Sequence, residues 1–236
     1  SGIKLQCHNL DTLGVICRGL DDLPLLRAAL TAGPFRPIDR AVSGAPRIGF
    51  CRTPAWEAAD TATQTLLERT ASRLAAAGAA VREVEFAAQF VTIHEHHRRI
   101  FNYEAARNYA YEYEQHHDKL SGVLRDTVLV PGRELPLGAY IEALETAEAF
   151  RRHLDELFED VDVLLTPSAA GEAPRGLGTT GDPRFNSIWT LGWVPCLTLP
   201  AAAGPTGLPL GIQLVGGRFA DEALLAAAAW VAAQLG

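Results

Sequence analysis

Apolar and polar positions recur with two different periods along the chain, and the changes of period predict alternating strands and helices. Arg47–Cys51 is a nearly continuous apolar run, which is typical of a buried strand. Glu57–Ala77 carries leucines and alanines at helical spacing, and Ala80–Phe86 alternates as a more exposed strand does. This strand–helix–strand order predicts an α/β fold.

The second half of the chain continues the same pattern. Leu137–Glu159 is the clearest helix, because its apolar residues recur every three or four positions. Other helices are predicted at Leu20–Ala32, Ala88–Asp118 (one long or broken helix), Leu120–Val130 (a weaker piece ending at Pro131), Phe185–Leu191 and Asp221–Leu235. Further strands are predicted at Val161–Thr166, ended by Pro167, and at Cys196–Leu199 and Gly211–Val215, with a turn at Gly204–Gly207 between the last two.

Length and charge narrow the class of protein. A chain of 236 residues suits one large domain or two small ones, and the Gly/Pro-rich connector at 33–46 is the best candidate for a boundary within it. The net charge of −7 and the scattered basic residues argue against a nucleic-acid partner. No long apolar span or secretory leader is recognisable, so we expect a cytoplasmic protein that acts on a small molecule and does not enter a membrane.

The cysteines and the absence of methionine also bear on what kind of chain this is. The four cysteines are widely spaced, which favours buried thiols over a disulfide framework. The chain has no Met, and we therefore expect that a segment precedes Ser1 in the intact protein.

The histidines are the first candidates for chemistry. A helical zinc site needs His at positions i and i+4, but Arg98 stands four residues after His94. His94 and His97 could share a face, although no third ligand is evident. We interpret the stretch as a solvated helix face and rank a metallohydrolase last among the alternatives.

No self-sufficient nucleophile is visible. The serines lack the Gly-x-Ser-x-Gly context, and the only lysines, Lys4 and Lys119, do not lie in strands. A better candidate is the Gly/Pro-rich loop over Ser168–Arg184, which follows a strand predicted to be buried. Ligands of α/β sheets bind beyond the carboxyl ends of strands, so this loop is either a binding loop or a mobile surface loop.

Three stretches resemble one family, the amidase-signature hydrolases. Leu10–Asp22 (LDTLGVICRGLDD) is similar to the end of the amidase signature. Asp162–Pro200, with DVLLTP, FNSIWTL and VPCLTLP, resembles the family's "DxLLTP … FNxxWTLLGxPCxxLP" segment. Gly207–Gly216 (GLPLGIQLVG) resembles its "GLPxGxQLVG" strand. The motifs occur in family order and span nearly the whole chain.

The resemblance implies a fold and a chemistry. It implies an α/β fold with a mixed β-sheet covered by helices, here incomplete because the N-terminal part is missing. It also implies hydrolysis of an amide by a Ser–cis-Ser–Lys triad, with no cofactor. Those three residues lie upstream of the signature end, and here only Ser1–Asn9 precedes it. We therefore assign no catalytic residue, expect the triad upstream of Ser1, and expect this chain alone to be inactive.

The resemblance also implies that the C-terminal part of a family member contributes the far side of the substrate pocket. The candidate substrate-binding residues are Thr180, Asp182, Phe185, Asn186, Trp189 and Trp193. Ordinary packing of a short helix is an equally good interpretation of the aromatic ones. Trp193 stands where the family usually has glycine, and we hypothesise that its indole restricts the acyl group to small or flat substrates.

These features lead to one main function and one alternative. The main hypothesis is an amidase that hydrolyses a C–N bond of a small-molecule amide. The alternative is a non-catalytic binding or scaffolding module derived from an amidase. Because a missing part would leave sheet edges uncovered, we also expect this chain to self-associate, as a homo-oligomer.

Overall fold

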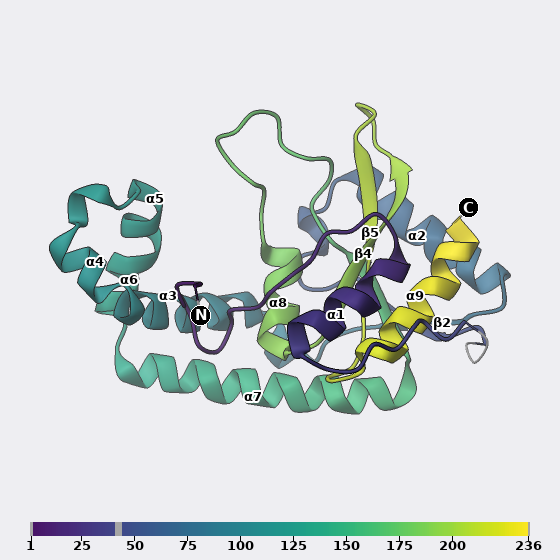
Figure 1. Ribbon diagram of the computed structural model, residues 1–236, viewed down its shortest axis with the longest axis horizontal. Coiled ribbons are helices and arrows are strands. Elements are labelled where there is room, and N and C mark those ends of the chain that lie inside the picture. Colours follow the sequence, from purple (N-terminus) through teal and green to yellow (C-terminus); the bar gives the residue numbers. More distant parts are fainter. Residues whose placement is uncertain (1, 41–43, 236) are drawn as a thin grey trace.

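The centre of the protein is a five-stranded mixed sheet, seen in a computed structural model that describes residues 2–40 and 44–235 (Figure 1). Its strands are β1 (Arg47–Cys51), β2 (Ala80–Val84), β3 (Val163–Pro167), β4 (Cys196–Ala203) and β5 (Pro209–Val215). They lie in the order β2-β1-β3-β5-β4. β1 is parallel to β2 and β3, whereas β5 is antiparallel to β3 and β4. The predicted mixed sheet is confirmed.

Helices cover both faces of this sheet. The α-helices are α1 (Leu23–Thr31), α2 (Thr61–Ala76), α3 (Ile93–Asn108), α4 (Ala110–Gln115), α5 (Gly122–Leu124), α6 (Val130–Glu134), α7 (Leu137–Asp160), α8 (Arg184–Gly192) and α9 (Asp221–Leu235). Short 3₁₀ turns occur at Leu20–Asp22, Trp56–Ala58, Ala88–Phe90 and His117–Lys119, and a π-helical turn at Arg125–Leu129. In Figure 1, α7 runs along the base of the molecule, and α4, α5 and α6 lie beyond the sheet.

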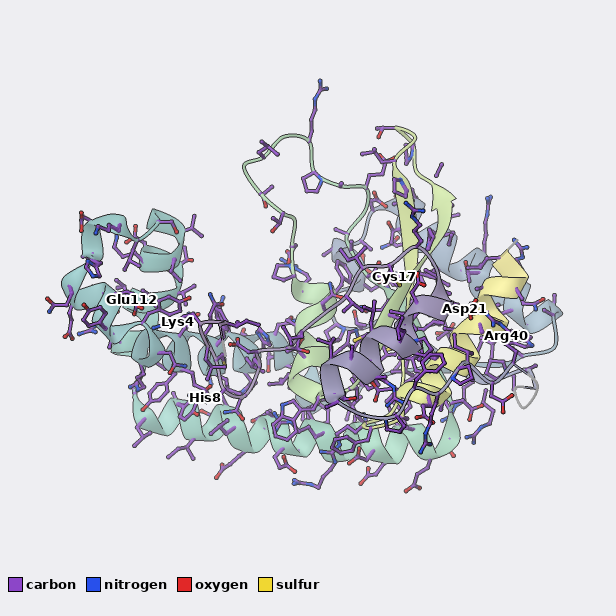
Figure 2. The ribbon with its side chains drawn as sticks, viewed as in Figure 1. Lys4, His8, Cys17, Asp21, Arg40 and Glu112 are labelled. Atoms are coloured by element: carbon purple, nitrogen blue, oxygen red, sulfur yellow. The ribbon has the colours of Figure 1, made fainter. Side chains whose placement is uncertain are left out.

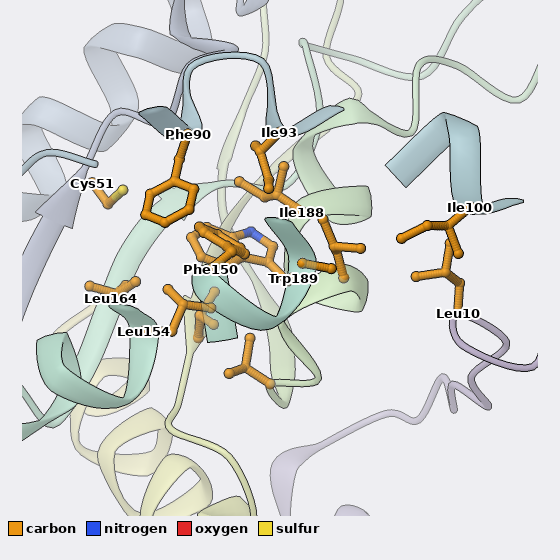
Figure 3. Packing of buried hydrophobic residues seen from close by; sticks show 14 of the residues in the cluster. Leu10, Cys51, Phe90, Ile93, Ile100, Phe150, Leu154, Leu164, Ile188 and Trp189 are labelled. Atoms are coloured by element: carbon orange, nitrogen blue, oxygen red, sulfur yellow. The ribbon is translucent and has the colours of Figure 1, made fainter. Parts of the chain in front are cut away.

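The alternation of side chains along the strands divides the core into two faces. Ile48 and Phe50 of β1 point to the face covered by α2 and α9, which we call the α9 face. Leu164 of β3 points to the face covered by α3, α7 and α8, which we call the α7 face. Figure 3 shows the α7 face, where the rings of Phe90, Phe150 and Trp189 pack together.

Most of the predicted elements are present, and the differences have local causes. β1 and α9 have the predicted bounds. α2 begins later than predicted because the Asp60 carboxylate accepts a hydrogen bond from the Thr63 amide and caps the helix there. Pro131 does not end a helix but lies in the first turn of α6, where its missing N–H is not needed. Pro167 is the last residue of β3 instead of lying outside it.

The region predicted as one long or broken helix is broken. The 3₁₀ turn at Ala88–Phe90 precedes α3, and α4 follows α3 directly. Gly132 of α6 allows this group of helices to pack closely, because a Cβ there would lie 1.9 Å from the Asn102 backbone oxygen.

The fold bears on two predictions about the whole chain, a domain boundary at 33–46 and the expectation that the chain does not enter a membrane. Part of the 33–46 connector, residues 41–43, lies outside the described residues, so a domain boundary there stays a prediction. Among the helices in ranges 2–40 and 44–235, none has the length and apolar character required to span a membrane.

Candidate functional site

A polar network lies where β3 ends and α8 begins. The Asn186 amide donates to the Ser168 carbonyl oxygen at 3.0 Å and accepts from Gln213 Nε2 at 2.6 Å. Thr166 and Gln213 are almost fully buried on the α7 face, and their Oγ1 and Oε1 atoms have no hydrogen-bond partner among the described residues. Asn186 itself is exposed. Buried polar atoms without partners are costly, so this network is a good candidate for a functional position.

The loop from Ser168 to Pro183 leaves the sheet beside this network, and its first part is well anchored. The Asp60 amide donates to the Ala170 oxygen at 2.6 Å. Glu172 accepts hydrogen bonds from the Thr206 hydroxyl and amide and from the Leu208 amide, and the hydrogen bond from Thr206 is the main reason that its pKa is lowered. An open hollow of about 450 Å³ lies between this part of the loop and residues 58–60.

Thr180 and Asp182 lie farther along the loop, and both are exposed. The Asp182 carboxylate accepts from the Arg184 amide at 3.0 Å and forms an ion pair with its guanidinium at 2.6 Å. Asp182 therefore stabilises the start of α8, and Arg184 already balances its charge.

Two of the predicted substrate-binding residues are core residues here. Phe185 and Trp189 have no exposed surface. Phe185 packs with Ala55 and Ala59, and the Trp189 ring lies edge-on to Phe86 at 5.9 Å. These side chains pack inside the fold and hold α8 in place. A part for them in substrate binding stays a prediction.

Trp193 is placed differently from the other aromatic residues. It ends α8 in the left-handed conformation, with φ 57°, and it is 48% exposed. Its indole N–H donates to the Asn9 carbonyl oxygen at 2.8 Å. The Arg151 guanidinium carbon lies 3.4 Å from the ring centroid, a cation–π contact.

Arg151 is a buried cation of α7. It is 3% exposed, and its Nε donates to the Leu191 carbonyl oxygen at 2.9 Å. Its Nη1 lies 3.3 Å from Glu148, whereas Nη2 has no partner among the described residues. Burial lowers its pKa, while Glu148 acts in the opposite direction.

The N-terminal segment is bound to α3 through another buried charge. The Glu104 carboxylate accepts from Asn9 Nδ2 at 2.5 Å, from the Asn9 amide at 3.1 Å, from Tyr140 Oη at 2.8 Å and from Cys7 Sγ at 3.1 Å. Burial opposes its ionisation, but these hydrogen bonds outweigh burial and lower its pKa. Nearby, Lys4 pairs with Glu112 at 2.8 Å (Figure 2).

The histidines form contacts within the fold. His94 Nδ1 lies 3.2 Å from Ser187 Oγ of α8, and His97 stacks on Phe101. Burial, and to a smaller extent His94, lowers the pKa of His97 to about 4. The prediction of a solvated face is therefore wrong for His94 and His97, because α3 packs against α8 there. Within the described part of the chain, no group of three or more His, Cys, Asp or Glu residues is placed to hold a metal ion.

Sequence reasoning missed Glu104 and Arg151, although the helical period marks both positions. Glu104 lies four residues after Ile100 and eleven after Ile93, both buried. Arg151 likewise falls four residues after Ala147. A charge on an otherwise apolar stripe is the signal that could have identified them.

Comparison with known proteins agrees with this arrangement. A family model described as Amidase matches residues 1–225. The 2-amino-5-chloromuconic acid deaminase of Comamonas testosteroni is 31% identical in an alignment of 265 positions that covers the whole chain and 54% of that protein. A solved amidase structure superposes with a TM-score of 0.81 at 28% identity, over 93% of this chain and 52% of that one. A bacterial aryl acylamidase of the amidase-signature family superposes with a TM-score of 0.67 at 18% identity, over 86% and 47%.

The chain thus spans about half the length of these relatives.

Proposed function

Because the chain belongs to the amidase family, we propose that it forms the substrate-pocket side of an enzyme that hydrolyses a C–N amide bond of a small molecule. The observation that carries this proposal is the family match, which extends over residues 1–225. The polar network around Asn186 supports it, because ligands of α/β sheets bind beyond the carboxyl ends of strands.

We further propose that the reaction uses a serine nucleophile from outside this chain. Neither lysine offers a proton relay here. Lys4 pairs with Glu112 at the surface, and Lys119 is exposed. In the proposed mechanism the serine attacks the amide carbonyl, a second serine and a lysine relay its proton to the leaving amine, and water then hydrolyses the acyl-enzyme. This chain would position the acyl group.

The pocket side that we propose consists of Thr180, Asp182, Asn186 and Trp193, held in place by the buried Phe185 and Trp189. This pocket side carries no net charge, because the one charged residue in it, Asp182, forms an ion pair with Arg184. One face of the Trp193 ring is covered by Arg151 and its N–H is used by Asn9, so its exposed surface lies mainly on the other face. These features favour an uncharged amide with a small or flat acyl group.

The full-length product of the encoding gene tests this proposal. It should release ammonia or an amine from a panel of benzamides, anilides and aliphatic amides. A fluorophosphonate probe, which labels activated serines, should modify a residue outside residues 1–236, as located by peptide mass spectrometry.

Each half of this experiment can contradict the proposal. If no amide in the panel is hydrolysed and the probe labels nothing, the protein is not an active amidase, and the binding-module alternative is favoured. If the probe labels a serine within this chain, the assignment of the nucleophile is wrong.

A further inference from the structure

The end of α8 is joined to the N-terminal segment through Trp193, a residue with an unfavourable backbone conformation. A left-handed φ is the usual conformation of glycine after a helix and is costly for a residue with a Cβ. Trp193 nevertheless adopts it, with φ 57°. Strained residues persist only where the surroundings hold them, so the contacts of the indole need an explanation.

Those contacts occupy one face and the polar edge of the ring. Arg151 lies against the face at 3.4 Å from the centroid, and Arg151 is held by the Leu191 carbonyl oxygen. The indole N–H donates to the Asn9 carbonyl oxygen at 2.8 Å. α7, the end of α8 and the N-terminal segment therefore meet at one side chain.

Asn9 continues this connection to α3. Its backbone amide and side-chain amide donate to the two carboxylate oxygens of Glu104, while its carbonyl accepts from Trp193. Asn9 is therefore hydrogen-bonded to both α3 and the end of α8. Leu10 and Asp11 follow directly, and their amides donate to the Cys7 carbonyl oxygen at 3.3 and 2.9 Å.

We infer that Trp193 is a positioning residue that fixes the segment Cys7–Asp11 between α3 and α8. Its indole N–H holds the Asn9 carbonyl, and Arg151 holds the indole. This role is separate from that of a pocket wall, which depends on the bulk and the exposed face of the ring and not on its N–H.

Only the expected effect of Trp193 on turnover rests on the proposed function; the positioning of Cys7–Asp11 does not. In the proposed enzyme this segment connects the catalytic part to the pocket side, so displacing it would shift the reacting groups relative to each other. Small displacements of that kind lower kcat more than they change KM when the substrate contacts themselves are kept.

Hydrogen–deuterium exchange of the full-length protein tests the positioning role without any assay of activity. Trp193→Phe keeps an aromatic ring over Arg151 but removes the N–H donor. We expect the amides of Asn9, Leu10 and Asp11 to exchange about fivefold faster in this variant, which corresponds to the loss of one hydrogen bond. Trp193→Gly, which removes both contacts, should increase the exchange further.

Phe219→Gly is the matched control for the backbone. Phe219 also has a positive φ, 61°, and is 94% exposed. Its replacement by glycine relieves the same conformation without touching the N-terminal segment, so the exchange at Asn9–Asp11 should not change.

Kinetics on the best amide substrate complete the test. In Trp193→Phe we expect kcat to fall about tenfold with KM nearly unchanged. Unchanged exchange at Asn9–Asp11 in both Trp193 variants would overturn the inference. If exchange is faster in Trp193→Phe while kcat and KM stay at the wild-type values, Trp193 holds the segment without affecting turnover, and the expected effect on kcat is wrong.

If the wild-type protein hydrolyses no amide at all, the proposed function fails by itself, and the exchange data still decide whether Trp193 holds the segment.

Discussion

The two faces of the sheet are both well packed, but they differ in the chemistry that they bury. The α9 face consists of aliphatic and aromatic side chains such as Ile48, Leu67 and Leu214, with two buried threonines on α2. The α7 face has a similar apolar cluster but also buries Glu104 and Arg151. Burying a charge is unfavourable unless the charge is paired or hydrogen-bonded. A fully apolar core would avoid this free-energy cost.

The buried charges of the α7 face indicate where function lies in this fold. Both buried charges bind segments in or beside the family-like stretches: Glu104 holds Asn9, directly before Leu10–Asp22, and Arg151 holds Trp193, within Asp162–Pro200. The candidate site around Asn186 is on the same face. The α9 face maintains the fold, whereas the α7 face also sets the positions of specific segments.

A substitution on the α9 face should produce the largest loss of stability and the least specific effect. Leu67 is fully buried against the sheet, and we expect Leu67→Ala to lower the free energy of unfolding by about 2–5 kcal/mol. Denaturant unfolding measures the loss. The half-buried neighbour in Leu66→Ala is the control, with a smaller expected loss. Local detachment of residues 7–11 in Leu67→Ala would contradict the division between the faces.

Glu104→Ala should have a slightly smaller but local effect on the α7 face. It leaves donors of Cys7, Asn9 and Tyr140 without their acceptor, and we expect a loss of about 2–3 kcal/mol. Limited proteolysis should show earlier cleavage within residues 2–12 than in the wild type. Equal resistance of that segment would mean that Glu104 does not anchor it.

The same carboxylate predicts a pH dependence. Its pKa is below the ordinary 4.5 in the folded protein, so its contribution to stability is fully present above pH 4.5 and is lost as the pH falls through the native pKa. Wild-type stability should therefore decline more steeply in acid than that of Glu104→Gln. Parallel pH profiles of the two proteins, measured by thermal unfolding, would show that the ionised form is not favoured on folding.

Trp193→Gly should change substrate range by a smaller factor. If the exposed face of the ring limits the acyl group, kcat/KM for bulky acyl amides should rise about tenfold relative to acetamide. Trp193→Phe keeps most of the bulk and is the control for this effect. An unchanged substrate profile in Trp193→Gly would remove Trp193 from the pocket.

The weakest expected effect concerns the sheet edges. Among the described strands, β2 and β4 each pair with one neighbour only. We expect the isolated chain of residues 1–236 to self-associate through an edge, which light scattering would detect. A monomer at all concentrations would contradict this expectation.

Much of the fold could be predicted from the sequence because the local pattern dictates it. The bounds of β1 and α9 follow from apolar runs and periodicity, and the α2–β2 unit follows from the strand–helix–strand order. The starting point of α2 could not be read from apolar spacing, since it depends on which residue provides the cap.

The site was less predictable because its contacts join distant segments. Asn186 was identified, but its partner Gln213 lies in another strand. The sequence does not show whether Phe185 and Trp189 are exposed or buried, because that depends on how α8 packs, and in this fold both are buried. The helical period marks Glu104 and Arg151 as buried charges, but their contacts with Asn9 and Trp193 join distant segments and leave no local pattern in the sequence.

Hydrogen–deuterium exchange of the full-length protein with phenylboronic acid tests whether the α7 face carries the substrate pocket. Phenylboronic acid forms a tetrahedral adduct with an activated serine. If the α7 face carries the pocket, exchange should slow in residues 180–193 and stay unchanged in α2 and α9. Protection confined to α2 or α9, or no protection anywhere in this chain, would contradict the account.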